Sequence, residues 1–204
     1  GRVGPFDYTL ALSSAGDAGY ENLYDSRRNT VLSFMGEWPF SAGGELQVQA
    51  GYARGDYGIE DPEPSLVTQP RDFPVTNNFQ TLRWRRQQGD GAEWVATLSH
   101  NRFDYGDRGF TNNRILPGVN LDFNYEIDEE RYEATLQHFR PLSERARGVL
   151  DLGYYHETVN SPRYFDTTDD LDNAVSWLGG HVEYRLRPQF VLNAGAMLEH
   201  SSLT

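Results

Sequence analysis

Residues 131–138 read RYEATLQH, and their side chains alternate between polar and apolar from Arg131 to Gln137. Tyr132, Ala134 and Leu136 occupy every second position of this stretch. A β-strand points successive side chains to opposite faces, so a period of two predicts a strand with one apolar and one polar face.

Eight further stretches show the same alternation, and none of the nine has a helical period. They are residues 6–13, 32–38, 46–52, 81–85, 94–99, 149–154, 178–186 and 192–199. The sequence therefore predicts an all-β protein, an antiparallel up-and-down meander of about nine strands.

The alternation also predicts which side chains share a face. We expect one apolar set on the convex, lipid-facing side: Leu10, Leu12, Phe34, Leu82, Leu98, Leu136, Leu152, Leu178 and Leu192. We expect one polar set on the concave side: Gln47, Arg83, Thr97, Glu133, Gln137 and His181.

The links between these stretches alternate between long and short. Residues 14–28, 54–77, 101–128 and 156–173 form long polar links with 18 acidic and 8 basic residues, within a chain of net charge -12. Short links surround residues 41–44, 88–91, 141–144 and 187–189. Bacterial outer-membrane barrels combine short periplasmic turns with long extracellular loops, and they place aromatic residues at the membrane interfaces. Trp38, Trp84 and Trp94 near strand ends fit such a girdle.

An apolar run of about twenty residues, which a membrane-spanning helix requires, is absent from the sequence. A form of this chain that crosses a bilayer can therefore only be a β-barrel. The pattern predicts a partial transmembrane barrel in the bacterial outer membrane.

Several stretches, in their order along the chain, resemble the front half of the β-barrel domain in TonB-dependent outer-membrane receptors. They are RYEATLQH, Pro141-Leu142-Ser143, Gly148 to Tyr155, SPRYF at 161–165, Glu183-Tyr184-Arg185 and FVLNAGAMLEHSSL at 190–203. The resemblance covers nearly the whole chain. It implies that residues 1–204 are part of a barrel of about 22 strands, with a plug domain before them and the remaining strands after them.

The resemblance also implies active transport of a scarce nutrient, such as a ferric siderophore or cobalamin. The TonB complex would supply energy through an N-terminal segment that lies outside these residues. Other expected partners are outer-membrane lipid, lipopolysaccharide and the small-molecule chelate or cofactor that is carried. A passive porin or adhesive barrel is the alternative, and a soluble β-sandwich or lectin is a third interpretation. The net charge of -12 argues against nucleic-acid binding.

No catalytic motif emerges, so we expect no enzyme, no catalytic or metal site and no cofactor. The five histidines are scattered, cysteine is absent, and neither a G-x-S-x-G elbow nor a glycine-rich phosphate loop is found. His181 and Glu183 could contact a ligand or a metal, but a packed polar pair is favoured. The run DTTDDLDN at 166–173 could hold calcium but lacks the glycine and terminal glutamate of an EF-hand, so a solvated loop is favoured. Arg83 and Arg85 could form a basic ladder, although pairing with acidic groups is favoured.

Arginine and aromatic side chains in the long links are the expected ligand contacts, because they bring directional donors and large contact areas. The candidates are Tyr57, Arg71, Arg102, Tyr105, Arg108, Arg114, Arg163, Tyr164 and Phe165. The alternative is that these side chains pack loop against loop or bind lipopolysaccharide.

Overall fold

The structure is a computed structural model that describes residues 1–21, 23–40, 43–59, 66–68, 70–113, 120–165 and 167–203. Within these residues, one antiparallel sheet holds β1 (Arg2–Val3), β2 (Phe6–Asp17), β3 (Arg27–Phe40), β4 (Gly44–Ile59), β5 (Leu66–Thr68), β6 (Arg71–Gln87), β7 (Glu93–Asn113), β8 (Asn120–Ser143), β9 (Ala146–Asn160), β10 (Leu171–Arg187) and β11 (Phe190–Ser201). A single-turn helix, α1 (Pro162–Phe165), lies between β9 and β10. In the described part of the chain, no helix is long and apolar enough to span a membrane.

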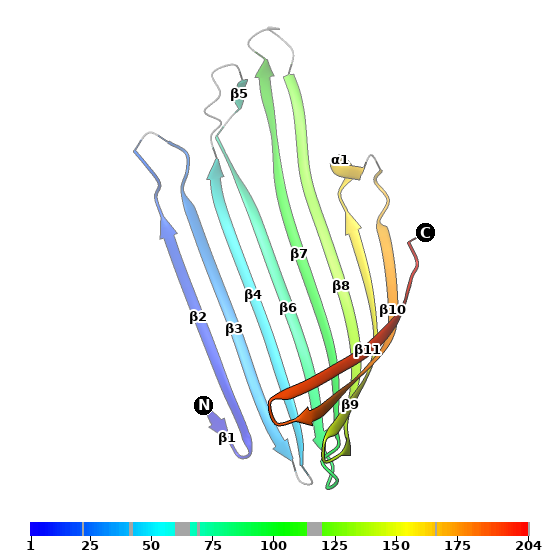
Figure 1. Cartoon of the computed structure of the whole chain (residues 1–204). Coiled ribbons are helices and arrows are strands. Elements are labelled where there is room, and N and C mark those ends of the chain that lie inside the picture. The colour runs from blue at the N-terminus through cyan, green and yellow to red at the C-terminus, as the bar shows by residue number, and fades with distance from the viewer. Residues whose placement is uncertain are drawn as a thin grey trace.

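The sheet is an up-and-down meander, as the alternation predicts. Neighbours in sequence are neighbours in the sheet, except that β5 pairs with the end of β7. Nine strands have at least 12 residues, and each contains one of the nine alternating stretches. The short turns all lie at one end of the sheet and the longer links at the other (Figure 1). Gly91, with φ of +80°, provides the left-handed conformation in the turn between β6 and β7.

The predicted extent of the long links is wrong, because the strands continue into them. The predicted link 101–128 is mostly β7 and β8, which have 21 and 24 residues. A tilted strand needs only about 9–11 residues to cross a bilayer. These two strands therefore project well beyond the apolar band. Alternation does not mark the projecting part because water surrounds both of its faces.

The strand register assigns every side chain of the nine long strands to one of two faces. In each pairing the Cα partners are both even-numbered or both odd-numbered, apart from the last pair after the irregularities at Pro141/Ser143 and Arg185/Arg187. Directly opposed residues of antiparallel strands share a face. The nine predicted apolar residues are all even-numbered, so they share one face of the sheet. The six predicted polar residues are all odd-numbered, so they share the opposite face. The predicted grouping of both sets is therefore confirmed.

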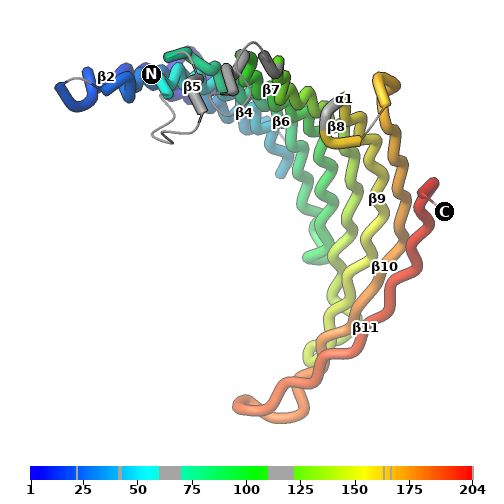
Figure 2. Tube along the Cα trace, turned by 90° about the horizontal axis from the view of Figure 1, so that it is seen from above, coloured from blue at the N-terminus to red at the C-terminus, as the bar shows by residue number. Residues whose placement is uncertain are grey.

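The sheet bends, and β2 lies far from β11 (Figure 2). Side chains converge on the inner side of a bend and spread apart on the outer side. The odd-numbered Val95, Asp107 and Val175 are 3%, 7% and 4% exposed, whereas the even-numbered Leu12 and Leu98 are 73% and 56% exposed. The helix α1 also lies inside the bend (Figure 2). We therefore call the odd-numbered side the inner face and the even-numbered side the outer face.

The position of the apolar band on the outer face shifts along the strand direction from β2 to β10. Following the register from Leu12 through each pairing leads to Asp172 on β10, but the first large apolar outer residue of β10 is Leu178, six residues further on. A shift of six residues along the strands, at a rise of about 3.3 Å per residue, occurs over seven strand spacings of about 4.8 Å across the sheet. The strands are therefore tilted by roughly 30° from the normal to the apolar band. Such a stagger is what a tilted barrel wall requires.

Candidate functional site

Aromatic side chains from four strands and α1 gather on the inner face, at the end of the sheet that carries the longer links. Tyr57 stacks on Phe73 with ring centroids 5.3 Å apart, and Phe73 meets the edge of Tyr105 at 5.7 Å. Tyr125 lies 5.9 Å from Tyr164 of α1. With Phe123, which is 5.7 Å from Tyr125, these residues form what we call the inner aromatic cluster: Tyr57, Phe73, Tyr105, Phe123, Tyr125 and Tyr164.

An ion pair crosses the middle of this cluster. The Nε and Nη2 atoms of Arg71 donate to the two carboxylate oxygens of Asp107 at 2.5 and 2.8 Å. The two side chains are only 16% and 9% exposed. The Arg71 guanidinium also lies over the Phe123 ring at 4.6 Å, in space that opens because Gly109 has no side chain. The bidentate contact and the ring together fix the arginine in one orientation.

The cluster lies outside the part of the sheet that spans the membrane. On β7 the outer face is apolar from Trp94 to Leu98, and Arg102 and Asp104 follow His100 toward the longer links. Tyr105 is therefore beyond the membrane-spanning segment. Burial raises the pKa of the Tyr105 hydroxyl, and the negative charge of Asp107 raises it further, while Arg71 opposes both. The phenol thus remains neutral and able to donate a hydrogen bond.

Polar side chains continue along the inner face toward the short turns. Arg131 lies over the Tyr155 ring at 4.0 Å and pairs with Glu133 at 2.9 Å. Further along, Asp151 accepts hydrogen bonds from Gln137 Nε2 at 2.8 Å and Trp177 Nε1 at 2.5 Å. This row of paired charges and amides makes the inner face of β8 to β10 hydrophilic between the cluster and the short turns.

The structure divides the nine candidate ligand residues. Tyr57, Arg71, Tyr105 and Tyr164 come together in the inner aromatic cluster. The first three lie on strands β4, β6 and β7, so their predicted placement in loops is wrong. The α1 residue Phe165 is 46% exposed.

The remaining candidates are not in the cluster. Arg102 and Arg108 lie on β7 but on the outer face, where Arg102 contacts Asp104 and Asp128 and Arg108 contacts Glu126. Arg114 lies outside the described residues, and of Arg163 only the backbone, in α1, is described.

Four members of the site escaped the sequence analysis: Phe73, Asp107, Phe123 and Tyr125. All four residues have odd numbers. Odd-numbered residues face inward in the membrane-spanning stretches, and the same rule holds in the projecting strands, so it could have identified these four residues. Glu183 of the suspected polar pair binds Arg147 at 3.0 Å. Asp170 of the acidic run accepts a hydrogen bond from Asn160 at 2.6 Å, while Asp166 lies outside the described residues. Across the described residues, no group of three or more His, Asp or Glu side chains is arranged to hold a metal ion.

Comparisons with known proteins find the same fold in a solved structure. No family model matches the chain, and no curated protein matches it. The structure is similar to that of the copper transporter OprC, with a TM-score of 0.50 and 16% sequence identity over 93% of this chain. The β domain of the Bordetella autotransporter BrkA gives a TM-score of 0.41 and 11% identity, covering 98% of this chain and 80% of that one. The chain spans 35% of the OprC chain.

The sheet therefore combines a tilted meander, an outer face of exposed apolar side chains and a hydrophilic inner face. A contiguous apolar surface of this extent marks contact with lipid or another partner. The chain has the fold of an outer-membrane β-barrel wall and belongs to the bacterial outer membrane.

Proposed function

We propose that this chain forms part of the barrel wall of a TonB-dependent receptor that takes up a scarce nutrient. In this proposal residues 1–204 contribute nine wall strands to a longer barrel, and a plug domain fills the lumen against the inner face. The protein is a transporter and performs no catalysis on its cargo.

The observation that carries the proposal is the inner aromatic cluster at the extracellular end of the hydrophilic inner face. Aromatic rings offer broad contact area to a bound molecule, and an oriented arginine adds directional donors. Arg71 is held by Asp107 at both oxygens, so the pair presents a fixed and nearly neutral polar point between the rings.

The charge around the cluster favours a neutral or cationic cargo over an anionic one. The ranges 14–28, 54–77, 101–128 and 156–173, which comprise the links and the projecting strand ends at this end of the sheet, hold 18 acidic and 8 basic residues. A mouth of one charge sign raises the local concentration of molecules with the opposite charge. Within the proposed class, this favours neutral or cationic ferric siderophores and cobalamin over highly anionic chelates.

Uptake in cells with and without TonB tests the proposal. Cells that express the protein from which this chain comes would be given radiolabelled iron on hydroxamate or catecholate siderophores, or radiolabelled cobalamin. We expect accumulation of one of these cargoes, and its loss when TonB is deleted. Accumulation that continues at the same rate without TonB would show passive diffusion and refute the receptor proposal.

Replacing Tyr57, Phe73 and Tyr105 together by alanine then tests the cluster. We expect weaker binding of the transported cargo with unchanged surface expression. The matched control replaces Tyr132 and Tyr154 of the outer face, which should leave binding unchanged.

A further inference from the structure

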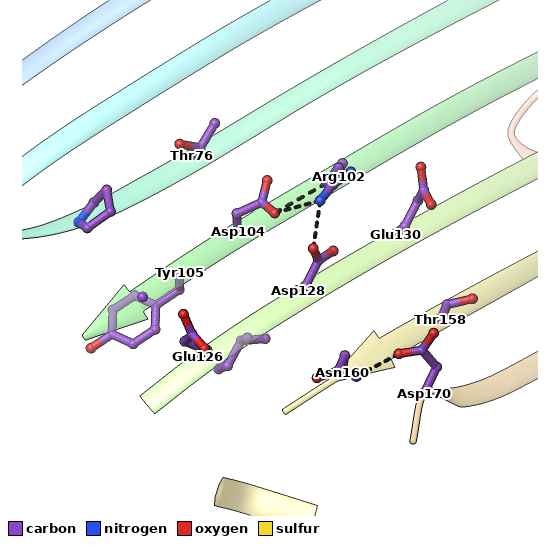
Figure 3. Close-up of a pocket in the computed structure, with 13 residues that line it drawn as sticks. Thr76, Arg102, Asp104, Tyr105, Glu126, Asp128, Glu130, Thr158, Asn160 and Asp170 are labelled. Carbon is purple, nitrogen blue, oxygen red and sulfur yellow. Dashed lines mark hydrogen bonds and ion pairs between the residues drawn. The ribbon is translucent and has the colours of Figure 1, made fainter. Parts of the chain in front are cut away.

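One edge of the projecting hairpin of β7 and β8 has no neighbouring strand. β9 pairs with β8 only as far as Asn160, which lies opposite Asp128, and the chain then turns into α1. Figure 3 shows Asn160 at the end of β9, next to the part of β8 that carries Asp128 and Glu126. Above α1, β8 continues toward the end of the sheet (Figure 1). Among the described residues, only β7 pairs with β8 at 120–127. We call the stretch 120–125 of β8 the open edge.

The backbone groups of alternate residues point out of the open edge. Ser161 donates its hydroxyl hydrogen to the backbone oxygen of Glu126 at 2.7 Å, so this carbonyl faces away from β7. Successive residues of a strand turn their N–H and C=O groups to opposite edges. The backbone groups of Asn120, Asp122 and Asn124 therefore also face away from β7. In the described part of the chain, none of these three has a backbone hydrogen bond across the open edge. The edge thus offers donors and acceptors in the geometry of a strand.

Two further features show that the hairpin can take a strand at its edge. Proteins protect exposed strand edges with proline, lysine or a β-bulge. Residues 120–125 read NLDFNY, and the register between β7 and β8 is regular throughout. Asp122 is the only charged residue of this stretch. The other edge of the same hairpin already carries an added strand, because β5 pairs with residues 111–113 of β7.

We propose that the open edge binds an extended segment of another protein at the cell surface, which joins β8 as an added strand. Strand addition is a general mode of peptide recognition, in which main-chain hydrogen bonds give affinity and alternate side chains give specificity. A segment of about six residues, an ordinary strand length, matches the open edge. The proposal depends on the extracellular position of this end of the sheet and not on TonB-dependent uptake.

The inner face beside the open edge favours apolar side chains on the added strand. Phe123 and Tyr125 have ring centroids 5.7 Å apart, and Tyr164 of α1 lies 5.9 Å from Tyr125. Tyr164 is 59% exposed, so its ring offers uncovered apolar area next to the edge. Inward-pointing aliphatic or aromatic side chains of an added strand would pack against these rings.

The outer face beside the open edge favours basic side chains at the alternate positions. Arg102 lies between Asp104 and Asp128, with contacts of 3.1 and 2.6 Å, as Figure 3 shows. Arg108 pairs with Glu126, whereas Asp122 has no ion pair with any described residue. Carboxylates therefore outnumber arginines around the edge, and a lysine or arginine of the added strand would meet Asp122. Opposite charges on neighbouring strands stabilise their pairing.

Charge and topology argue against other occupants. A second copy of this chain would bring its own Asp122 and the same excess of carboxylates, and like charges on neighbouring strands repel. Strands that follow β11 in a longer barrel would continue from the free side of β11, because neighbours in sequence are neighbours in this meander. A basic and apolar segment of a different protein is the occupant that fits.

Binding of a cyclic β-hairpin peptide to the detergent-solubilised full-length protein, measured by fluorescence anisotropy, tests the proposal. One strand of the peptide alternates arginine and valine and has a free outer edge. The control peptide carries N-methyl groups on the amides of that edge and has the same side chains. We expect the unmodified peptide to bind at least about tenfold more tightly, because methylation removes the hydrogen-bond donors. Equal affinities, or no binding of the unmodified peptide, would overturn the proposal.

Asn124→Pro tests the open edge from the side of the protein. Proline removes the N–H that faces the open edge and leaves the ladder with β7 intact, as at other edge positions. The matched control, Asn124→Ala, removes the same side chain and keeps the N–H. We expect Asn124→Pro to weaken binding of the arginine–valine peptide about tenfold and Asn124→Ala to leave it unchanged, with equal surface expression. Equal affinities of the two variants would contradict strand addition at this edge.

Asp122→Asn tests the choice of a basic partner. The comparison peptide has glutamine in place of each arginine. We expect the wild-type protein to prefer the arginine peptide, and Asp122→Asn to reduce that preference at least about threefold. An unchanged preference would contradict the proposed charge of the partner. A dimer of the full-length protein that forms without peptide and is lost in Asn124→Pro would assign the edge to a second copy and overturn the proposal.

Discussion

Adjacent residues on β8 allow the two faces to be compared with one kind of substitution. Leu136 lies on the outer face opposite Ala96 and Leu152, and Gln137 lies on the inner face opposite Asp151. Leu136→Arg places a charge in lipid, whereas Gln137→Arg places the same charge beside a carboxylate that the Gln137 amide already contacts at 2.8 Å. We expect Leu136→Arg to lower the free energy of unfolding and Gln137→Arg to leave it nearly unchanged.

The size of the effect follows from the depth of Leu136. It is two residues from His138, which stacks on Trp94 at one edge of the band, and four residues from Tyr132 at the other. With about 3.3 Å per residue and the tilt of roughly 30°, these separations are about 6 and 11 Å along the membrane normal. An arginine costs about 2–4 kcal/mol at the bilayer midplane and about 0–1 near the interfaces, so we expect about 2 kcal/mol at this depth.

Unfolding of the full-length protein from lipid vesicles by guanidinium chloride, monitored by tryptophan fluorescence, measures both variants. A cost of about 2 kcal/mol corresponds to an almost thirtyfold smaller folding equilibrium constant. Gln137→Arg should change the free energy of unfolding by less than about 0.5 kcal/mol. If Gln137→Arg were as costly as Leu136→Arg, or costlier, the assignment of the two faces would be refuted.

Three further predictions concern packing, the buried ion pair and pH. In Gly153→Ala, the new Cβ would lie 1.9 Å from the Trp177 ring, so we expect a loss of about 1–3 kcal/mol in vesicle unfolding, but little change in the control Gly179→Ala, where the nearest atom is 3.6 Å away. Asp107→Ala removes both carboxylate contacts of Arg71, so we expect a loss of about 3 kcal/mol, the low end for breaking a buried pair; a loss below about 1 kcal/mol would mean that water screens this pair. The hydrogen bond that Tyr24 donates to Asp72 at 3.0 Å raises the pKa of Tyr24 above 10.0. Its stabilising effect is therefore present below the unfolded-state pKa and is lost as pH rises through the folded-state value. Ultraviolet titration, compared with Tyr24→Phe, should show a lower pKa for Tyr24 in Asp72→Asn, and an unchanged pKa would exclude Asp72 as the cause.

The membrane-spanning part of the fold could be predicted from sequence because lipid and water impose a period of two on it. In RYEATLQH, Tyr132, Ala134 and Leu136 face outward, and Glu133, Thr135 and Gln137 face inward. The same contrast located all nine long strands and both sets of face residues. It also separated the short turns from the longer links.

The contrast disappears where the strands leave the bilayer. Beyond His100, β7 continues with Arg102 and Asp104 on the outer face and Asp107 on the inner face. Both faces meet water there, so hydropathy cannot distinguish a strand from a polar loop. For this reason the candidate ligand residues were found by type but not by face, and Arg71 and Arg102 were grouped although they lie on opposite sides of the sheet.

The meeting of Tyr164 with Tyr125 could not be predicted either, because it depends on where α1 lies. Ser161, just before α1, is 2% exposed and donates to the backbone oxygen of Glu126 at 2.7 Å. This hydrogen bond ties the start of the link to β8, and nothing in the local sequence pattern marks it.

The central claim is that, within the membrane-spanning part of the sheet, even-numbered strand residues face lipid and odd-numbered residues face the lumen. Residues 1–204 contain no cysteine. In the full-length protein, with any cysteine elsewhere replaced and any lumen-filling plug deleted, single-cysteine variants at residues 132 to 137 can be labelled in outer membranes with a membrane-impermeant maleimide, and again after denaturation to confirm that each thiol reacts. We predict labelling at 133, 135 and 137 and protection at 132, 134 and 136, while cysteines at 128 and 129 both react because that part of β8 projects into water. Labelling without a period of two, or labelling of the even-numbered positions instead, would contradict the account.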